Sequence, residues 1–107
     1  MKSNEPPKKY RDFIARFPKL GEAWEAIHAA EAEGPLDERA ARLVKLAVAI
    51  GAGREGAVHA AARKAQKAGV TAEAMEQVVV LAAATLGMPG CVAAHCWVRD
   101  VLDKAGA

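Results

Sequence analysis

Alanine is the residue that most constrains this fold, because it fills 26 of the 107 positions, almost as many as the 27 held by Leu, Ile, Val, Phe, Met and Trp together. Alanine has the highest helix propensity and almost no side chain, so the sequence predicts an all-α protein with closely approaching helices. A core built from alanine buries little apolar area per residue. We therefore expect a homo-oligomer, in which further surface is buried between identical subunits.

The length of the chain fits one domain, because either half would be too short for a hydrophobic core of its own. With 52% hydrophobic residues, 26% charged residues and a formal net charge of +2, the composition is that of a folded soluble protein. We predict a flexible N-terminal tail over residues 1–7 and a single helical domain over residues 8–107. Outside the tail the small basic excess is spread along the chain, so we expect no nucleic-acid partner.

The sequence contains no apolar run close to the ~20 residues of a membrane span. Its first ten residues also lack the apolar segment of a signal peptide. We therefore expect a cytoplasmic protein with no membrane partner. The two cysteines, Cys91 and Cys96, are too few for a disulfide framework, and their spacing places them on diverging sides of a helix.

Six helices are predicted from apolar residues at helical spacing and from the residues that break or cap them. Their limits are Pro7 and Pro18 for the first, Pro18 and Gly34 for the second, Asp37 and Gly51 for the third, about Arg54 and Ala68 for the fourth, Thr71 and Gly87 for the fifth, and Cys91 and about Lys104 for the sixth. Gly69 is expected as a left-handed C-cap, and Gly87, Pro89 and Gly90 as the last loop. No strand pattern accompanies these helices, so the predicted architecture is a six-helix bundle.

The fifth predicted helix is apolar on all sides over residues 78–84. A helix of this kind is buried on every side or lies against another subunit. The sequence leaves these two arrangements open.

A longer pattern then becomes visible. The stretch from Leu36 to Gly90, "LDERAARLVKLAVAIGAGREGAVHAAARKAQKAGVTAEAMEQVVVLAAATLGMPG", resembles the carboxymuconolactone decarboxylase and alkylhydroperoxidase D (AhpD)-like family. Its most specific parts are the Leu36-Asp37 pair, the turn at residues 68–71 and the loop at residues 87–89. The resemblance covers residues 17 to about 103. It implies an AhpD-like bundle of six helices that assembles as trimers or hexamers.

The residues of the family's redox chemistry are missing from this chain. Redox members carry a glutamate, a CxxC motif and a histidine, whose positions here are Arg42, Arg54, Ala57 and Ala61. The decarboxylase branch lacks CxxC but also tends to have a histidine at the position of Ala61. A thiol peroxidase needs a thiolate, a base and a resolving thiol. We therefore expect no CxxC peroxidase activity at this site.

Two arginines stand where the redox members have an acid and a thiol. Arg54 also lies at the start of a predicted helix behind the 51–53 turn, where free backbone N–H groups and a guanidinium favour an anion. We hypothesise that Arg42 and Arg54 bind a small-molecule carboxylate. The alternative is that both are surface residues paired with Glu38 or Glu55.

A carboxylate and an imidazole share one face of the fourth predicted helix, because Glu55 and His59 are four residues apart. A carboxylate beside an imidazole orients it and raises its affinity for a proton, which suits a general base. The alternative is an exposed pair that stabilises the helix by only ~0.3–0.5 kcal/mol.

The last predicted helix repeats this spacing with Cys91 and His95, and three interpretations remain open. In the first interpretation, Cys91 is a reactive thiol at a helix N-terminus and is paired with His95. Alternatively, Cys91 and His95 face Glu55 and His59 and hold a metal ion. In the third, Cys91 and Cys96 are small apolar residues of the core. We predict no metal site and no cofactor.

The leading functional hypothesis is a member of this family that performs cofactor-free acid–base chemistry, decarboxylation or isomerisation, on a small organic acid. Arg42 and Arg54 would hold the substrate carboxylate, and His59 with Glu55 or His95 would move the proton.

Two alternatives belong to other functional classes. In one, Cys91 supports a thiol-dependent peroxidase or oxidoreductase activity. In the other, the protein is a non-catalytic binding or assembly protein that keeps the fold.

Overall fold

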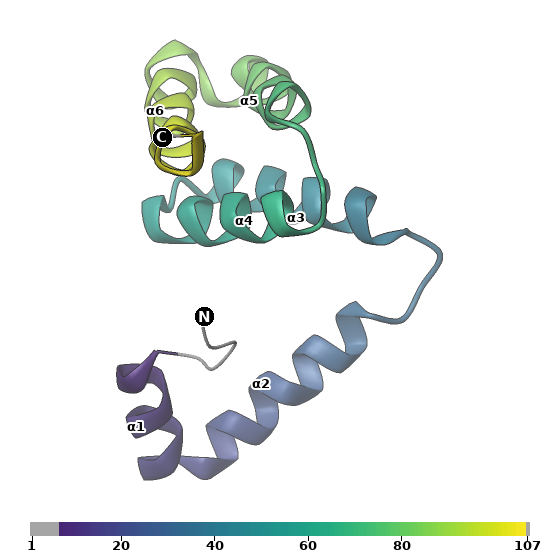
Figure 1. Cartoon of the computed structure of the whole chain (residues 1–107), viewed down its shortest axis with the longest axis vertical. Helices are drawn as coiled ribbons and strands as arrows, with labels where there is room; N and C mark the ends of the chain where they lie inside the picture. The colour runs from purple at the N-terminus through teal and green to yellow at the C-terminus, as the bar shows by residue number, and fades with distance from the viewer. Residues whose placement is uncertain (1–6, 107) are drawn as a thin grey trace. The chain divides into compact units, whose positions relative to one another are not determined.

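The computed structural model describes residues 7–106, with side chains up to residue 104, and within them every regular element is a helix (Figure 1). The six helices are α1 (Lys8–Arg16), α2 (Pro18–Glu31), α3 (Glu38–Ala52), α4 (Glu55–Lys67), α5 (Ala72–Leu86) and α6 (Met88–Gly106). The prediction of an all-α chain with six helices is confirmed. Residues 1–6 of the predicted tail lie outside the described residues.

Contacts within the chain form two compact units, one ending at Pro35 with α1 and α2 and one beginning at Leu36 with α3 to α6. Whether residues 8–107 act as one domain stays a prediction. In the first unit, α1 and α2 contact each other and expose several large apolar side chains, which are Phe13, Phe17, Leu20, Trp24 and Ile27.

The hydrophobic core lies in the second unit. There α3 and α4 form one layer and α5 and α6 the other, with α3 against α5 and α4 against α6 (Figure 1). Its largest fully buried side chains are Leu46, Ile50, Val58, Met75 and Val98. Buried alanines lie between them, at positions 49, 62, 65 and 94, and allow the close helix approach that the composition predicts. The pairing of α4 with α6 matters most for function, because it brings together side chains far apart in the sequence.

Side-chain caps begin two helices where the sequence predicts them. The Asp37 carboxylate accepts a hydrogen bond from the Ala40 N–H at 2.8 Å at the start of α3. The Thr71 hydroxyl accepts one from the Ala74 N–H at 3.1 Å at the start of α5. Each cap satisfies a backbone donor that the first helical turn leaves free.

The predicted loop at residues 87–90 is wrong. Only Gly87, with φ +80°, separates α5 from α6. Helix α6 begins at Met88 and has Pro89 in its first turn. A proline is tolerated there because the first-turn N–H groups have no helical acceptor. The helix therefore starts three residues before Cys91.

The interpretation of the fifth helix as buried on every side is also wrong for the single chain. Val80 and Leu81 are 67% and 71% exposed, whereas Met75 and Val79 face the core. An apolar surface thus remains on α5. Within residues 7–106, no helix combines the length and apolar content needed to cross a membrane.

Gly69 supplies a first test of this fold. Gly69 follows α4 and has φ +87°. An added Cβ would lie 2.9 Å from the guanidinium of Arg39. The Nε of this guanidinium donates a hydrogen bond to the Ala68 carbonyl at 3.4 Å. We expect Gly69→Ala to lower the free energy of unfolding by about 1–2 kcal/mol, measured by urea denaturation. Gly51→Ala is the control, because Gly51 is helical with open space around it, and alanine there should stabilise by about 0.5–1 kcal/mol. Equal effects of the two substitutions would contradict this account of the α4 end.

Candidate functional site

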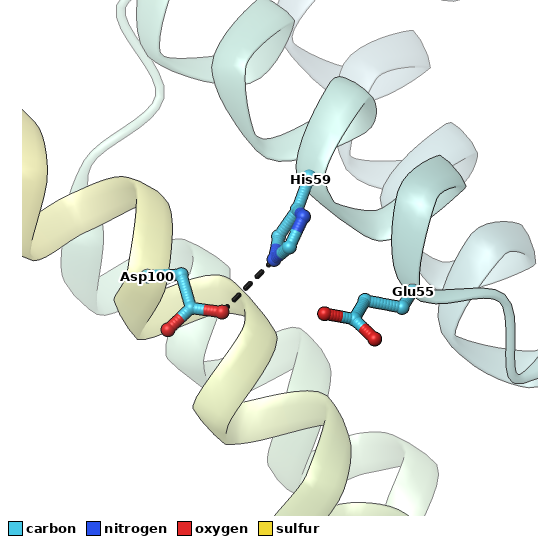
Figure 2. A group of neighbouring side chains, drawn as sticks. All are labelled: Glu55, His59 and Asp100. Carbon is cyan, nitrogen blue, oxygen red and sulfur yellow. Dashed lines mark hydrogen bonds and ion pairs between the residues drawn. The ribbon is translucent and has the colours of Figure 1, made fainter.

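Three acid–base groups meet where α4 packs against α6. Glu55 and His59 come from α4 and Asp100 from α6 (Figure 2). His59 Nε2 lies 2.9 Å from Asp100 Oδ2, and one ligand atom from each of the three residues lies within 4.8 Å of the others. An ionised carboxylate only accepts hydrogen bonds, so the imidazole N–H at Nε2 donates to Asp100. This leaves the lone pair of the neutral ring on Nδ1.

Core packing on both helices fixes this arrangement. Val58 is fully buried directly before His59, and Val98 and Val101 are buried on either side of Asp100. The imidazole consequently lies at the edge of the core with 25% of its side chain exposed, while the Asp100 side chain is 59% exposed. A half-buried ring held by an accessible carboxylate is oriented and still open to a small molecule.

Glu55 and His59 share one face of α4, as their spacing predicts, and the Glu55 carboxylate points toward the other two groups (Figure 2). Asp100 is the residue that the sequence analysis missed. Nothing in the chain marks it, because its partner is 41 residues away and only the α4–α6 packing brings them together.

His95 belongs to a different cluster. Its Nε2 lies 2.9 Å from Glu76 Oε2 on α5, and Arg99 Nη1 lies 3.6 Å from the same oxygen. Arg99 also forms a close ion pair with Asp103 one turn further along α6. His95 and Asp100 are five residues apart on α6, hence about 140° apart around the helix. The structure therefore does not bring His59 and His95 into one site.

Charge pairing shifts two pKa values in this second cluster. The hydrogen bond from His95, aided by the positive charge of Arg99 and opposed by desolvation, lowers the pKa of Glu76 below its ordinary value. The hydrogen bond to Asp103 is the main cause that raises the pKa of Arg99. Both pKa shifts arise from one ion network that connects α5 to α6.

The Glu76 shift gives a pH prediction with a definite sign. The folded chain holds the Glu76 proton less tightly than the unfolded chain, so the stabilisation is complete above the unfolded pKa of about 4.3 and is lost as pH falls through the lower folded pKa. We expect Glu76→Gln to lower the urea midpoint at neutral pH and to have a smaller effect near about pH 3. A difference between the two proteins that stays constant over this range would contradict the assignment.

The Cys91 thiol and the His95 imidazole have different hydrogen-bond partners. Cys91 Sγ donates to the Val79 carbonyl of α5 at 3.5 Å, and the Cys91 N–H donates to the Gly87 carbonyl inside the first turns of α6. Among the described residues no side-chain hydrogen bond joins Cys91 to His95, and the thiol is half-buried rather than at the open start of a helix. Cys96 is an exposed free thiol.

Arg42 and Arg54 lie at opposite ends of α3. Arg42 is half-buried in the second turn of α3, and Arg54 is the exposed residue that precedes α4. The helical rise from residue 42 to the end of α3 is about 15 Å, so one chain does not bring the two guanidinium groups together. Within residues 7–106, neither arginine forms an ion pair with Glu38 or Glu55.

The metal arrangement considered from the sequence, with Cys91 and His95 facing Glu55 and His59, does not occur. In the part of the chain that the structure describes, Glu55, His59 and Asp100 form the one group of at least three His, Cys, Asp or Glu residues close enough to share an ion.

Comparisons with known proteins bear on most of the second unit and part of the first. The family model described as the carboxymuconolactone decarboxylase family matches residues 18–100, which include α2 to α5 and the three residues of the α4–α6 site. Comparison with curated proteins and with solved structures gives no significant match.

Proposed function

Because the chain belongs to the carboxymuconolactone decarboxylase family, we propose that it performs cofactor-free acid–base chemistry, decarboxylation or isomerisation, on a small organic acid. The observation that carries this proposal is the hydrogen bond between His59 Nε2 and Asp100, with the Glu55 carboxylate beside it. This arrangement provides a basic nitrogen on an oriented imidazole whose side chain is 25% exposed.

The proton transfers follow from the ring geometry. In an isomerisation, His59 Nδ1 takes a proton from a carbon activated by a neighbouring carbonyl and returns it to another carbon of the same conjugated system. In a decarboxylation, the bond to the carboxylate carbon breaks, CO₂ leaves, and the protonated ring gives its proton to the carbon that keeps the electron pair. Asp100 stabilises the imidazolium in both reactions, since it accepts a hydrogen bond from Nε2 throughout.

Arg54 and Arg42 remain the proposed carboxylate-binding residues. Because they lie at opposite ends of α3, we expect them to contribute unequally to substrate binding. Arg54 directly precedes Glu55 at the start of α4, where the helix dipole also favours an anion. Arg42 lies at the far end of α3. We expect Arg54→Ala to raise KM more than Arg42→Ala does.

Turnover of small unsaturated carboxylic acids tests the proposed function. Carboxymuconolactone is the first compound to try, given the family, with CO₂ release and the loss of conjugated absorbance as the two signals. Turnover without added cofactor supports the proposal. Failure with every acid, in a folded and assembled protein, would favour a binding or assembly protein instead.

We also propose that the chain forms a homo-oligomer, a trimer or a hexamer. The support is a set of exposed apolar side chains on α3 and α5, two helices that pack against each other. Its residues are Val44, Val48, Val80 and Leu81, each about half exposed or more. Exposed apolar groups of this kind on neighbouring helices are typical of subunit contacts.

A further inference from the structure

The α4–α6 site has the donors of a metal site. Glu55 and Asp100 offer carboxylate oxygens and His59 offers a ring nitrogen, with mutual separations of at most 4.8 Å. Donors bound to a tetrahedral zinc ion at about 2.0–2.2 Å lie about 3.3–3.6 Å from one another. We propose that Glu55, His59 and Asp100 bind one divalent transition-metal ion, for which Zn²⁺ is the probe.

Only a small movement separates the present arrangement from a ligand set. His59 Nε2 and Asp100 Oδ2 are 2.9 Å apart, and both helices hold their positions through core residues. An ion bound between these two atoms replaces their hydrogen bond, so the ring proton moves to Nδ1 and the lone pair of Nε2 faces the ion. Glu55 is exposed at the first position of α4, so its side chain is free to turn toward the ion. The backbone need not change.

The α4–α6 site and the His95–Glu76 pair differ in the charged groups around them. Within the described residues, no lysine or arginine forms an ion pair with Glu55 or Asp100, so two carboxylates face one imidazole. At the second cluster, Arg99 lies 3.6 Å from the Glu76 oxygen that His95 contacts. A dication is attracted to the first arrangement and repelled by the guanidinium of the second.

The donor types favour particular ions. An imidazole with two carboxylates suits Zn²⁺, Co²⁺, Mn²⁺ or Ni²⁺, whereas Mg²⁺ and Ca²⁺ prefer oxygen donors alone. Three protein ligands leave a fourth tetrahedral position for water.

Metal binding also predicts inhibition, a consequence that rests on the proposed function. A neutral imidazole has one basic lone pair, and an ion bound to His59 occupies it. The ring then cannot accept a proton from a substrate, so Zn²⁺ is expected to suppress acid–base turnover at this site.

Isothermal titration of the metal-free full-length protein with Zn²⁺ tests the site. We expect one ion per chain, and at least about tenfold weaker binding in each of Glu55→Gln, His59→Gln and Asp100→Asn. His95→Gln is the matched control and should bind as the wild type does. Co²⁺ in place of Zn²⁺ should give the visible absorption of a low-coordinate site in the wild type and in His95→Gln, but not in the three ligand variants.

Two results would overturn the metal site. One is wild-type binding no tighter than that of Glu55→Gln, a variant of an exposed residue that leaves the core intact. The other is an equal loss in His95→Gln. Turnover is measured separately after chelation, so an inactive protein that binds Zn²⁺ would contradict the proposed function alone, and an active protein that binds no Zn²⁺ would contradict the metal site alone.

Discussion

Replacing His59 with glutamine is expected to lower kcat by about 10²–10⁴-fold, the usual contribution of a general base. Glutamine keeps an N–H group that can donate to Asp100 but has no basic nitrogen at neutral pH. The α4–α6 contact should therefore persist while proton transfer is lost. Steady-state kinetics on the acid that the wild type turns over, with circular dichroism to verify folding, measures the effect.

Two matched substitutions make this result specific. His95→Gln removes an imidazole that is also 2.9 Å from a carboxylate, and Cys91→Ser removes the half-buried thiol. Both proteins should keep kcat within a few-fold of the wild type. Activity that survives His59→Gln and disappears in Cys91→Ser would replace acid–base chemistry with thiol chemistry.

Leu81→Glu is expected to dissociate the proposed oligomer into single chains of 11.2 kDa. Leu81 is 71% exposed in the single chain, so glutamate should be accommodated in the monomer. In a subunit contact the same carboxylate would be buried without a partner, which is costly. Size-exclusion chromatography with light scattering gives the mass directly.

Leu81→Met is the control, since it keeps an apolar side chain of similar volume. It should elute with the wild type, as three or six chains. A wild type that is monomeric at high concentration, or a Leu81→Glu protein with the wild-type mass, would contradict the proposed subunit contact through the exposed apolar residues of α3 and α5.

Local signals in the sequence predicted the helix ends well. Asp37 and Thr71 cap helices through hydrogen bonds to residues three positions later, and the φ of Gly69 follows from the turn after α4. These features depend on neighbours along the chain, so a single sequence contains the relevant information.

The error at residues 87–90 has a local cause as well. Pro89 and Gly90 both suggest a loop, but proline is compatible with a first helical turn. Gly90 allows close approach of Leu86, whose Cβ would lie 3.2 Å from an added Cβ. This shift of the α6 start removed the argument that Cys91 lies at a helix N-terminus.

Long-range packing was the part that the sequence could not supply. Spacing placed Glu55 and His59 on one face, yet it could not tell which helix lies opposite, and the partner is Asp100 rather than His95. Similarly, the apolar run of α5 predicts burial without indicating that Val80 and Leu81 are exposed in the single chain. Residue periodicity reports the environment of a face and not the identity of its neighbour.

The most direct measurement of the central claim compares kcat and KM for Asp100→Asn and Glu76→Gln. Each substitution removes the charge of a carboxylate that lies 2.9 Å from a histidine nitrogen. If His59 and Asp100 form the catalytic pair, Asp100→Asn lowers kcat by about tenfold or more with little change in KM, and Glu76→Gln leaves both near wild type. Equal kcat values for the two variants, or a loss confined to Glu76→Gln, would contradict the assignment of the chemistry to the α4–α6 site.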